Sequence, residues 1–156
     1  MILSTELAEK NILEVTYPLD QIVLDALSKE DWNAIDQHFL KESASGGKLF
    51  TFLQSYLDFG SIEHIIAIRS APTDEDGIWH DDGSRILGFT ISLTENSNQI
   101  KGGELRFKKK TDKDFLAIST RPIGQMLLFK TGIYGFEHMV TAVTYGKRMI
   151  IAGWCS

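Results

Sequence analysis

Two histidines and one aspartate stand out because together they could hold a metal ion. His80 and Asp82 are two positions apart, so in an extended chain their side chains point to the same side. His138 lies far downstream and opens an apolar segment, with Val140 and Ala142 on its own side. Two imidazoles and one carboxylate can occupy three adjacent positions on Fe(II) and leave the opposite face open. These residues predict a non-haem iron site; the alternatives are an acidic loop and a hydrogen-bonded core histidine.

Arg148 is the candidate for binding an organic anion beside that metal. A buried arginine is costly unless an anion meets it, and its guanidinium can bind a carboxylate through two parallel hydrogen bonds. Alternation places it on the same face as three apolar residues, Ile150, Ala152 and Trp154. The opposite arrangement, with Arg148 exposed at a turn and Met149 and Ile151 facing inward, stays open because both faces are apolar.

From residue 61 onward the sequence consists of short β-forming segments separated by Gly, Asp, Asn and Pro. Eight strands are predicted, at 62–70, 78–82, 85–94, 103–108, 115–119, 125–131, 136–144 and 147–154. Eight short strands after a helical start favour two facing antiparallel sheets, a jelly roll or double-stranded β-helix, with helices against one outer face. The predicted fold class is therefore mainly β with N-terminal helices.

Residues 1–60 are predicted to be mainly helical and to buttress the jelly-roll core of 61–156, all within one domain. A short strand is expected at 11–17, ended by Pro18, which cannot donate to a β-ladder. Two or three helices are expected: 19–27, one that begins after an N-cap at Ser28, and 49–57 with its stop at Gly60.

Composition excludes several classes of partner. The chain has 156 residues, of which 43% are hydrophobic and 24% charged, as in ordinary globular domains. A net charge of −5 argues against nucleic acid, whose phosphates need a basic surface. The single cysteine, Cys155, gives no sign of an oxidising compartment, and neither a signal peptide nor a membrane span of about 20 apolar residues is evident. The expectation is a cytoplasmic protein with no membrane partner; its oligomeric state is open.

Several motifs in order resemble one enzyme family. The order H-x-D, distant histidine and basic residue resembles the Fe(II)- and 2-oxoglutarate-dependent dioxygenases. The segment from Gly102 to Phe107, GGELRF, resembles a strand of their prolyl 4-hydroxylase-like branch. Pro122 and Gly124 followed by MLLF, and the close from His138 to Trp154, resemble further motifs of that branch. The resemblance covers about residues 62–154.

This resemblance implies a cofactor set and a reaction. His80, Asp82 and His138 would bind Fe(II), and the far carboxylate of the co-substrate 2-oxoglutarate would pair with Arg148. With O2, and with ascorbate in support, the enzyme would release succinate and carbon dioxide and hydroxylate an unactivated C–H bond. The substrate would be a peptide or protein segment; the alternatives are a free amino acid or other small metabolite, or a non-catalytic metal- or ligand-binding jelly roll.

Two departures from the family are visible. Its tyrosine on the strand before H-x-D is absent, so Ser70, Thr90 or Ser92 is expected to supply the hydroxyl that helps hold 2-oxoglutarate. Many relatives carry lysine where this chain has Arg148. The neighbouring Lys147 is the alternative residue for binding the co-substrate carboxylate, but its side chain is expected on the opposite side of the strand.

Other polar residues are assigned simpler roles. His38 and His64 are interpreted as structural and Arg85 as a surface position, while Trp79 could line the pocket or pack in the core. The loops 72–77 and 95–101 are the candidate lids, and the acids Asp74, Glu75 and Asp76 would favour a basic substrate.

Overall fold

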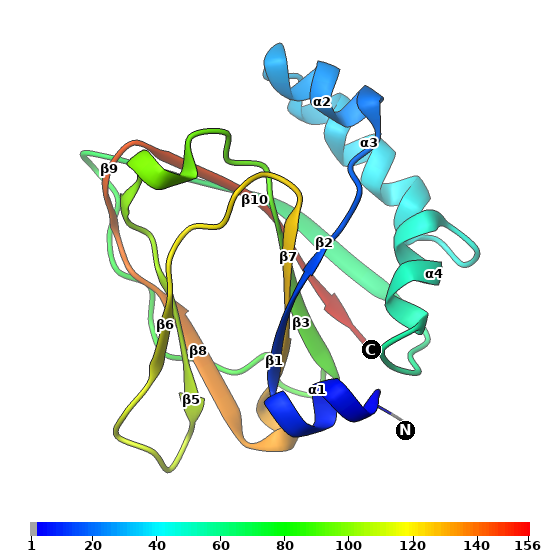
Figure 1. The fold of residues 1–156 in the computed structure, drawn as a ribbon, viewed down its shortest axis with the longest axis vertical. Helices are drawn as coiled ribbons and strands as arrows, with labels where there is room; N and C mark the ends of the chain where they lie inside the picture. The colour runs from blue at the N-terminus through cyan, green and yellow to red at the C-terminus, as the bar shows by residue number, and fades with distance from the viewer. Residues whose placement is uncertain (1–2) are drawn as a thin grey trace.

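The computed structural model describes residues 3–156 and shows two facing layers of strands with helices stacked on one side (Figure 1). The helices are α1 (Thr5–Lys10), α2 (Gln21–Ser28), α3 (Trp32–Ser43) and α4 (Lys48–Gln54), with short 3-10 turns η1 (Ser97–Gln99) and η2 (Gly132–Tyr134). The strands are β1 (Ile12–Thr16), β2 (Ile62–Ser70), β3 (Leu87–Ser92), β4 (Lys101–Gly102), β5 (Leu105–Lys109), β6 (Leu116–Ile118), β7 (Gln125–Lys130), β8 (Phe136–Val140), β9 (Val143–Tyr145) and β10 (Lys147–Cys155).

The strands form a jelly roll, as the sequence predicts. The major sheet has the order β1-β7-β3-β10-β2, the minor sheet has the order β6-β5-β8, and β4 pairs with β9 in a separate ribbon. All of these pairings are antiparallel. β1 joins the major sheet beside β7, so the N-terminal segment contributes a strand as well as helices.

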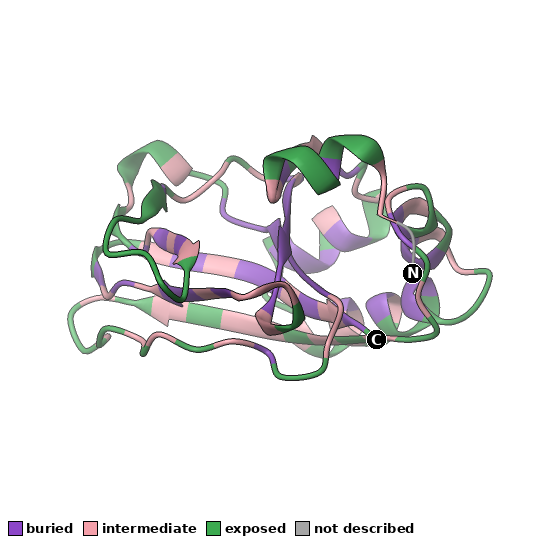
Figure 2. Cartoon of the chain, turned by 90° about the horizontal axis from the view of Figure 1, so that it is seen from below, coloured by how far each residue is buried: buried purple, intermediate pink, exposed green. Residues whose placement is uncertain are grey.

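Two apolar cores hold the layers together (Figure 2). The larger core lies between the helices and the outer face of the major sheet, where Phe39 and Leu53 pack with Ile91 and Ile151. The smaller core lies between the two sheets and contains Leu105, Phe107, Ile118, Leu127, Phe129 and Phe136. Because alternate residues of a strand face opposite sides, the major sheet can supply apolar side chains to both cores. None of the helices in residues 3–156 has the length and apolar character that crossing a bilayer requires.

The helix ends differ from the sequence prediction. The N-cap of α3 is Asp31, whose side chain accepts a hydrogen bond from the Ala34 amide at 3.1 Å. Ser28 is instead the last residue of α2, because Glu30 adopts a left-handed conformation with φ of 52° and turns the chain between the helices. Gly60 does not stop α4, which ends at Gln54; its amide instead donates to the Ser156 carbonyl at 2.6 Å.

Three strand predictions are corrected. Residues 78–82 form no strand; this segment pairs only at His80, through two backbone hydrogen bonds with His138. The segment 136–144 is divided into β8 and β9 because the amides of Thr141 and Ala142 turn to Glu104 and Asp76 rather than to one continuous partner strand. The segment 103–108 is β5, which starts at Leu105 and is preceded by the separate β4.

Gly102 is expected to be essential for stability. Its φ is +73°, and a Cβ added there would overlap the backbone oxygen of Ala142. Gly102→Ala should therefore lower the free energy of unfolding by more than the about 1–2 kcal/mol that a left-handed residue costs by itself. Gly46→Ala is the matched control: its φ is +79°, but a Cβ there meets nothing within 4 Å. Urea unfolding of both variants measures the difference, and equal losses would contradict the steric explanation.

Candidate functional site

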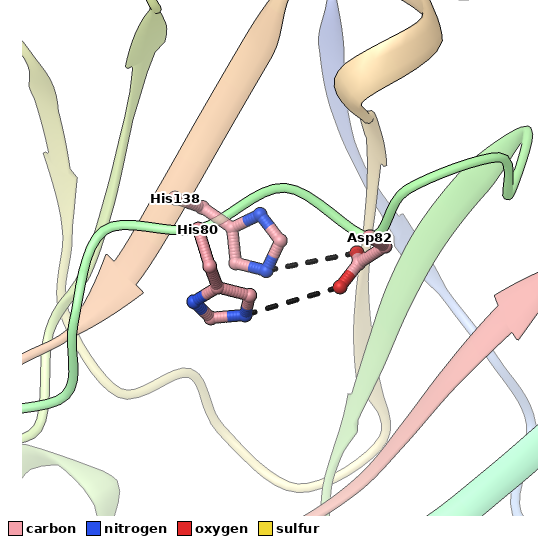
Figure 3. Close-up of side chains that lie close together, drawn as sticks. All are labelled: His80, Asp82 and His138. Carbon is pink, nitrogen blue, oxygen red and sulfur yellow. Dashed lines mark ion pairs between the residues drawn. The ribbon is translucent and has the colours of Figure 1, made fainter.

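His80, Asp82 and His138 converge although they lie on separate segments (Figure 3). His138 comes from β8, His80 from the segment bridged to it, and Asp82 from the turn before β3. The Nε2 atom of His80 lies 3.8 Å from Asp82 Oδ1, and the Nε2 atom of His138 lies 3.7 Å from Asp82 Oδ2. Three ligand atoms, one from each residue, lie within 4.8 Å of one another. The geometry therefore presents three donors to one point.

The donor set fits a ferrous ion. The Nδ1 atom of His80 lies 2.8 Å from the Ile78 carbonyl, which can only accept, so Nδ1 carries a proton and the neutral ring has its lone pair on Nε2. Asp82 is buried, and its Oδ2 has no hydrogen-bond partner. A buried carboxylate oxygen without a partner is unfavourable, and a cation coordinated by Nε2 of both histidines would satisfy it.

His138 is kept neutral by its surroundings. Burial lowers the pKa of His138 to about 4, against a smaller raising effect of Asp82. Its ring packs against Phe129 at a centroid distance of 4.8 Å. A neutral imidazole is the form that binds a metal, so His138 does not need to lose a proton at neutral pH.

The same pKa shift makes stability dependent on pH. The unfolded chain takes up a proton on His138 near pH 6.5, whereas the folded protein does so only near pH 4. Between these values the unfolded state binds more protons, so the free energy of unfolding of the metal-free protein should fall as the pH is lowered from about 6.5 toward about 4. Urea titrations across this window should show a flatter profile for His138→Gln; identical profiles would contradict the assignment.

A cavity of about 150 Å³ adjoins the two histidines inside the jelly roll. Arg148 lines it together with Ile150, Ala152 and Trp154, which resolves the alternative that the sequence left open. Met149 and Ile151 face the other way and belong to the larger core. Lys147 lies outside the cavity lining and pairs with Glu30 at 2.7 Å.

Arg148 is a buried cation that makes no ion pair in residues 3–156, since Asp74, which acts on it electrostatically, is paired with Arg69. Its exposed fraction is 5%, its Nε has no hydrogen-bond partner, and within residues 3–156 its guanidinium forms no ion pair. Burial lowers the pKa of Arg148 to about 10, so it remains protonated at neutral pH. An isolated buried charge is unfavourable, and an anion entering the cavity would compensate it.

The three residues predicted to offer a hydroxyl to 2-oxoglutarate, Ser70, Thr90 and Ser92, lie in different places in the structure. Thr90 lines the cavity, whereas Ser70 does not; it lies on the face of β2 opposite to Arg69. Ser92 is also outside this cavity, and its hydroxyl donates to the Arg121 carbonyl at 2.6 Å. Of the three, only Thr90 is therefore placed to meet a ligand there.

Sequence reasoning missed Arg69, which also lines the cavity. It is paired in register with Arg148 across β2 and β10, and its Nη1 lies 3.3 Å from Asp74. Two adjacent strand cations on one face repel unless anions lie near them. The alternation of Ile65, Ala67 and Arg69 was the available signal, but strand pairing was needed to place Arg69 opposite Arg148.

The predicted lids are not free loops. In 72–77, Asp74 accepts from the Val143 amide and Asp76 from the Ala142 amide, both at 2.7 Å. Two of the three acids are thus used internally, which removes the reason to expect a basic substrate. The loop 95–101 borders a different surface hollow, beside Tyr145.

The structure also shows where Trp79 and Arg85, the aromatic and cationic residues near the H-x-D segment, lie. Trp79 lies neither in the cavity lining nor in a core, but against Phe115 and beneath the ammonium of Lys108. Arg85 pairs with Glu63 and covers the ring of Trp154, 4.8 Å from its centroid, at the cavity edge.

Several known proteins of similar structure are prolyl hydroxylases. A prolyl-4-hydroxylase from Pseudomonas putida is 18% identical, with a TM-score of 0.68 over 96% of this chain and 90% of that one. A prolyl hydroxylase from Trichoplax adhaerens, solved with a hypoxia inducible factor peptide fragment, is 14% identical, with a TM-score of 0.65 over 96% and 85%. A viral collagen prolyl hydroxylase from Paramecium Bursaria Chlorella virus-1, solved with 2OG, is 16% identical, with a TM-score of 0.58 over 94% and 96%.

The family itself is shown by sequence. A search of curated proteins finds no match. The model of the 2OG-Fe(II) oxygenase superfamily, in contrast, matches residues 68–156, more than half of the chain and the part that carries all four candidate residues. The chain therefore belongs to the 2OG-Fe(II) oxygenase superfamily, whose members are oxidoreductases that use Fe(II), 2-oxoglutarate and O2.

Proposed function

We propose that this enzyme hydroxylates prolyl residues in a peptide or protein segment, with iron held by His80, Asp82 and His138 and the distal carboxylate of 2-oxoglutarate held by Arg148. The observation that carries the proposal is one cavity that joins two metal-facing imidazoles to an uncompensated buried guanidinium. The bound iron would supply the oxidising chemistry with O2 and 2-oxoglutarate. The protein residues would bind, orient and exclude water.

Each cavity residue has a physical task in this proposal. Arg148 attracts one end of a dicarboxylate and leaves its other end free to reach the metal. Thr90 offers a hydroxyl beside it. The walls contributed by Leu105, Phe129 and Ile150 are apolar, which keeps water away and strengthens the electrostatic contacts inside.

The size of the cavity favours a substrate that stays partly outside. Sites that enclose small organic ligands usually measure about 300–1,000 Å³, whereas this cavity measures about 150 Å³. Once 2-oxoglutarate occupies it, a second small molecule would not be enclosed. The site is also open at the metal, because the His80 side chain is 47% exposed. An extended chain passing over this opening would place one residue at the iron.

Structural relatives support the substrate class. Three of the similar structures described above are prolyl hydroxylases, and one of these was solved with a peptide fragment. Trp154 lines the cavity, and its ring, which Arg85 covers, would offer an apolar surface to a prolyl ring.

The experiment compares substrates with and without an accessible proline. The protein is incubated with Fe(II), 2-oxoglutarate and ascorbate, together with a proline-containing peptide pool, a pool in which every proline is alanine, and free amino acids including proline. We expect succinate release and a gain of one oxygen atom only with the first pool. Hydroxylation of a free amino acid would instead establish a metabolite hydroxylase. Absence of both turnover and iron-dependent 2-oxoglutarate binding would indicate a non-catalytic jelly roll.

A further inference from the structure

A second group of side chains that could hold a metal ion, Asp20, His38 and Glu42, belongs to the helical layer. The helices α2 and α3 of this layer lie on one side of the major sheet (Figure 1). Asp20 occupies the N-cap position of α2, but its side chain makes no capping hydrogen bond. His38 and Glu42 are one turn apart on α3, so their side chains share one face of that helix. These three residues join the segment between β1 and α2 to the middle of α3.

The distances in this cluster match the coordination of a small divalent ion. His38 Nε2 lies 3.1 Å from Asp20 Oδ2 and 3.4 Å from Glu42 Oε1. A tetrahedral metal bound at about 2.0–2.1 Å separates its ligand atoms by about 3.4 Å. The chosen ligand atoms of all three residues lie within 4.8 Å of one another. Both histidine–carboxylate distances are shorter than the corresponding distances of 3.8 and 3.7 Å among His80, Asp82 and His138.

Glu42 gives the independent sign that a cation belongs there. Only 6% of the residue is exposed, and neither of its carboxylate oxygens has a hydrogen-bond partner. The buried hydroxyl of Tyr17 is a neighbouring donor: it faces Glu42 closely enough for the two groups to shift each other's pKa, although they form no hydrogen bond of standard geometry. Burial raises the pKa of Glu42, as expected for a carboxylate removed from water. A buried carboxylate is stable when a cation or several donors meet it.

Lys48 fills this role only in part, because its ion pair with Glu42 is long. Its ammonium lies 2.6 Å from Asp20 Oδ1, on the oxygen that does not face His38, and it also donates to the Pro18 carbonyl. It is 3.9 Å from Glu42 Oε1, too far for a hydrogen bond. Lys48 therefore orients Asp20 from outside and leaves Oδ2 directed at His38.

We propose that Asp20, His38 and Glu42 form a second metal site, for a four-coordinate divalent ion such as Zn²⁺, that fastens α3 to the segment before α2. The site is independent of the oxygenase reaction. It belongs to the class in which mixed imidazole and carboxylate ligands bind zinc, and its binding energy would stabilise the folded state.

The test measures metal binding directly in a protein whose first site is disabled. Asp82→Ala supplies that background, and Co²⁺ and Zn²⁺ are the probes. We expect one equivalent of Co²⁺ with the intense visible absorption of a tetrahedral ion, and a rise in Tm on adding Zn²⁺. Adding Glu42→Gln or His38→Gln should weaken binding by more than the about 10–100-fold that loss of a residue supporting a ligand costs.

His64→Gln in the same background is the matched control. His64 Nε2 lies 2.9 Å from Asp36 in the same layer, but no third ligand in residues 3–156 completes that pair. This variant should keep the full equivalent of Co²⁺. The metal-free Glu42→Gln protein should be at least as stable as its parent, since it loses a buried charge, so loss of binding there cannot be attributed to unfolding. No bound metal in the Asp82→Ala protein, or equal binding with Glu42→Gln and His64→Gln, would overturn the proposal.

Discussion

Asp82→Ala is expected to abolish stoichiometric Fe(II) binding and to lower kcat/KM by well over about 100-fold, since even residues that merely support metal ligands contribute about 10–100-fold. The variant removes the only carboxylate in the group that it forms with His80 and His138. Two imidazoles alone leave the ion without a charged ligand and with one protein position vacant. Anaerobic Fe(II) titration and succinate release measure the two effects separately.

Asp81→Ala is the control for that experiment. Asp81 is adjacent in sequence, but its carboxylate faces away, pairing with Lys110 and accepting the Gly83 amide at 2.8 Å. An exposed ion pair contributes little to stability, so this variant should bind iron and turn over like the parent. Equal sensitivity of the two positions would mean that the register of the H-x-D segment differs from the one described.

Arg148→Ala should weaken 2-oxoglutarate by roughly 30-fold or more while sparing iron. Truncating one partner of a buried, hydrogen-bonded charge pair typically costs about 2–5 kcal/mol. The ligand-free variant should be as stable as the parent or more stable, because it loses a buried cation that makes no ion pair in residues 3–156. Calorimetric titration with 2-oxoglutarate on the Mn²⁺-loaded protein and urea unfolding of the ligand-free protein measure these opposite effects.

Two controls identify the contact behind that loss. 2-Oxopentanoate has the same keto acid but lacks the distal carboxylate, so it should bind parent and variant equally weakly. Lys147→Ala should leave 2-oxoglutarate affinity unchanged, because Lys147 pairs with Glu30 outside the cavity. A loss with 2-oxopentanoate as large as that with 2-oxoglutarate would show that Arg148 acts on the metal end and not on the carboxylate.

The parts of the fold that sequence predicted are those with strong local patterns. β2, β3, β7 and β10 were all recognisable from runs of β-branched and apolar residues, and α3 and α4 from their apolar faces, whereas α1 was not predicted. Predictions failed where local signals competed. Ser28 and Asp31 are both good N-caps, and only the turn at Glu30 decides between them. The segment 78–82 has strand-like composition but meets a partner at His80 alone.

The sequence by itself determined which functional groups are available: an H-x-D pair, a distant histidine and a basic residue in a fixed order. Tertiary structure decided which way these residues face. β10 is apolar on both faces, so local alternation cannot decide whether Arg148 or Met149 points into the cavity. The packing of Ile151 in the larger core decides it, because Met149 lies on the same face as Ile151. Pairing of β2 with β10 placed Arg69 beside Arg148, and the docking of α3 brought His38 and Glu42 to Asp20. Such juxtapositions join residues far apart in the chain, and burial selects them because it acts on the whole fold and not on local sequence.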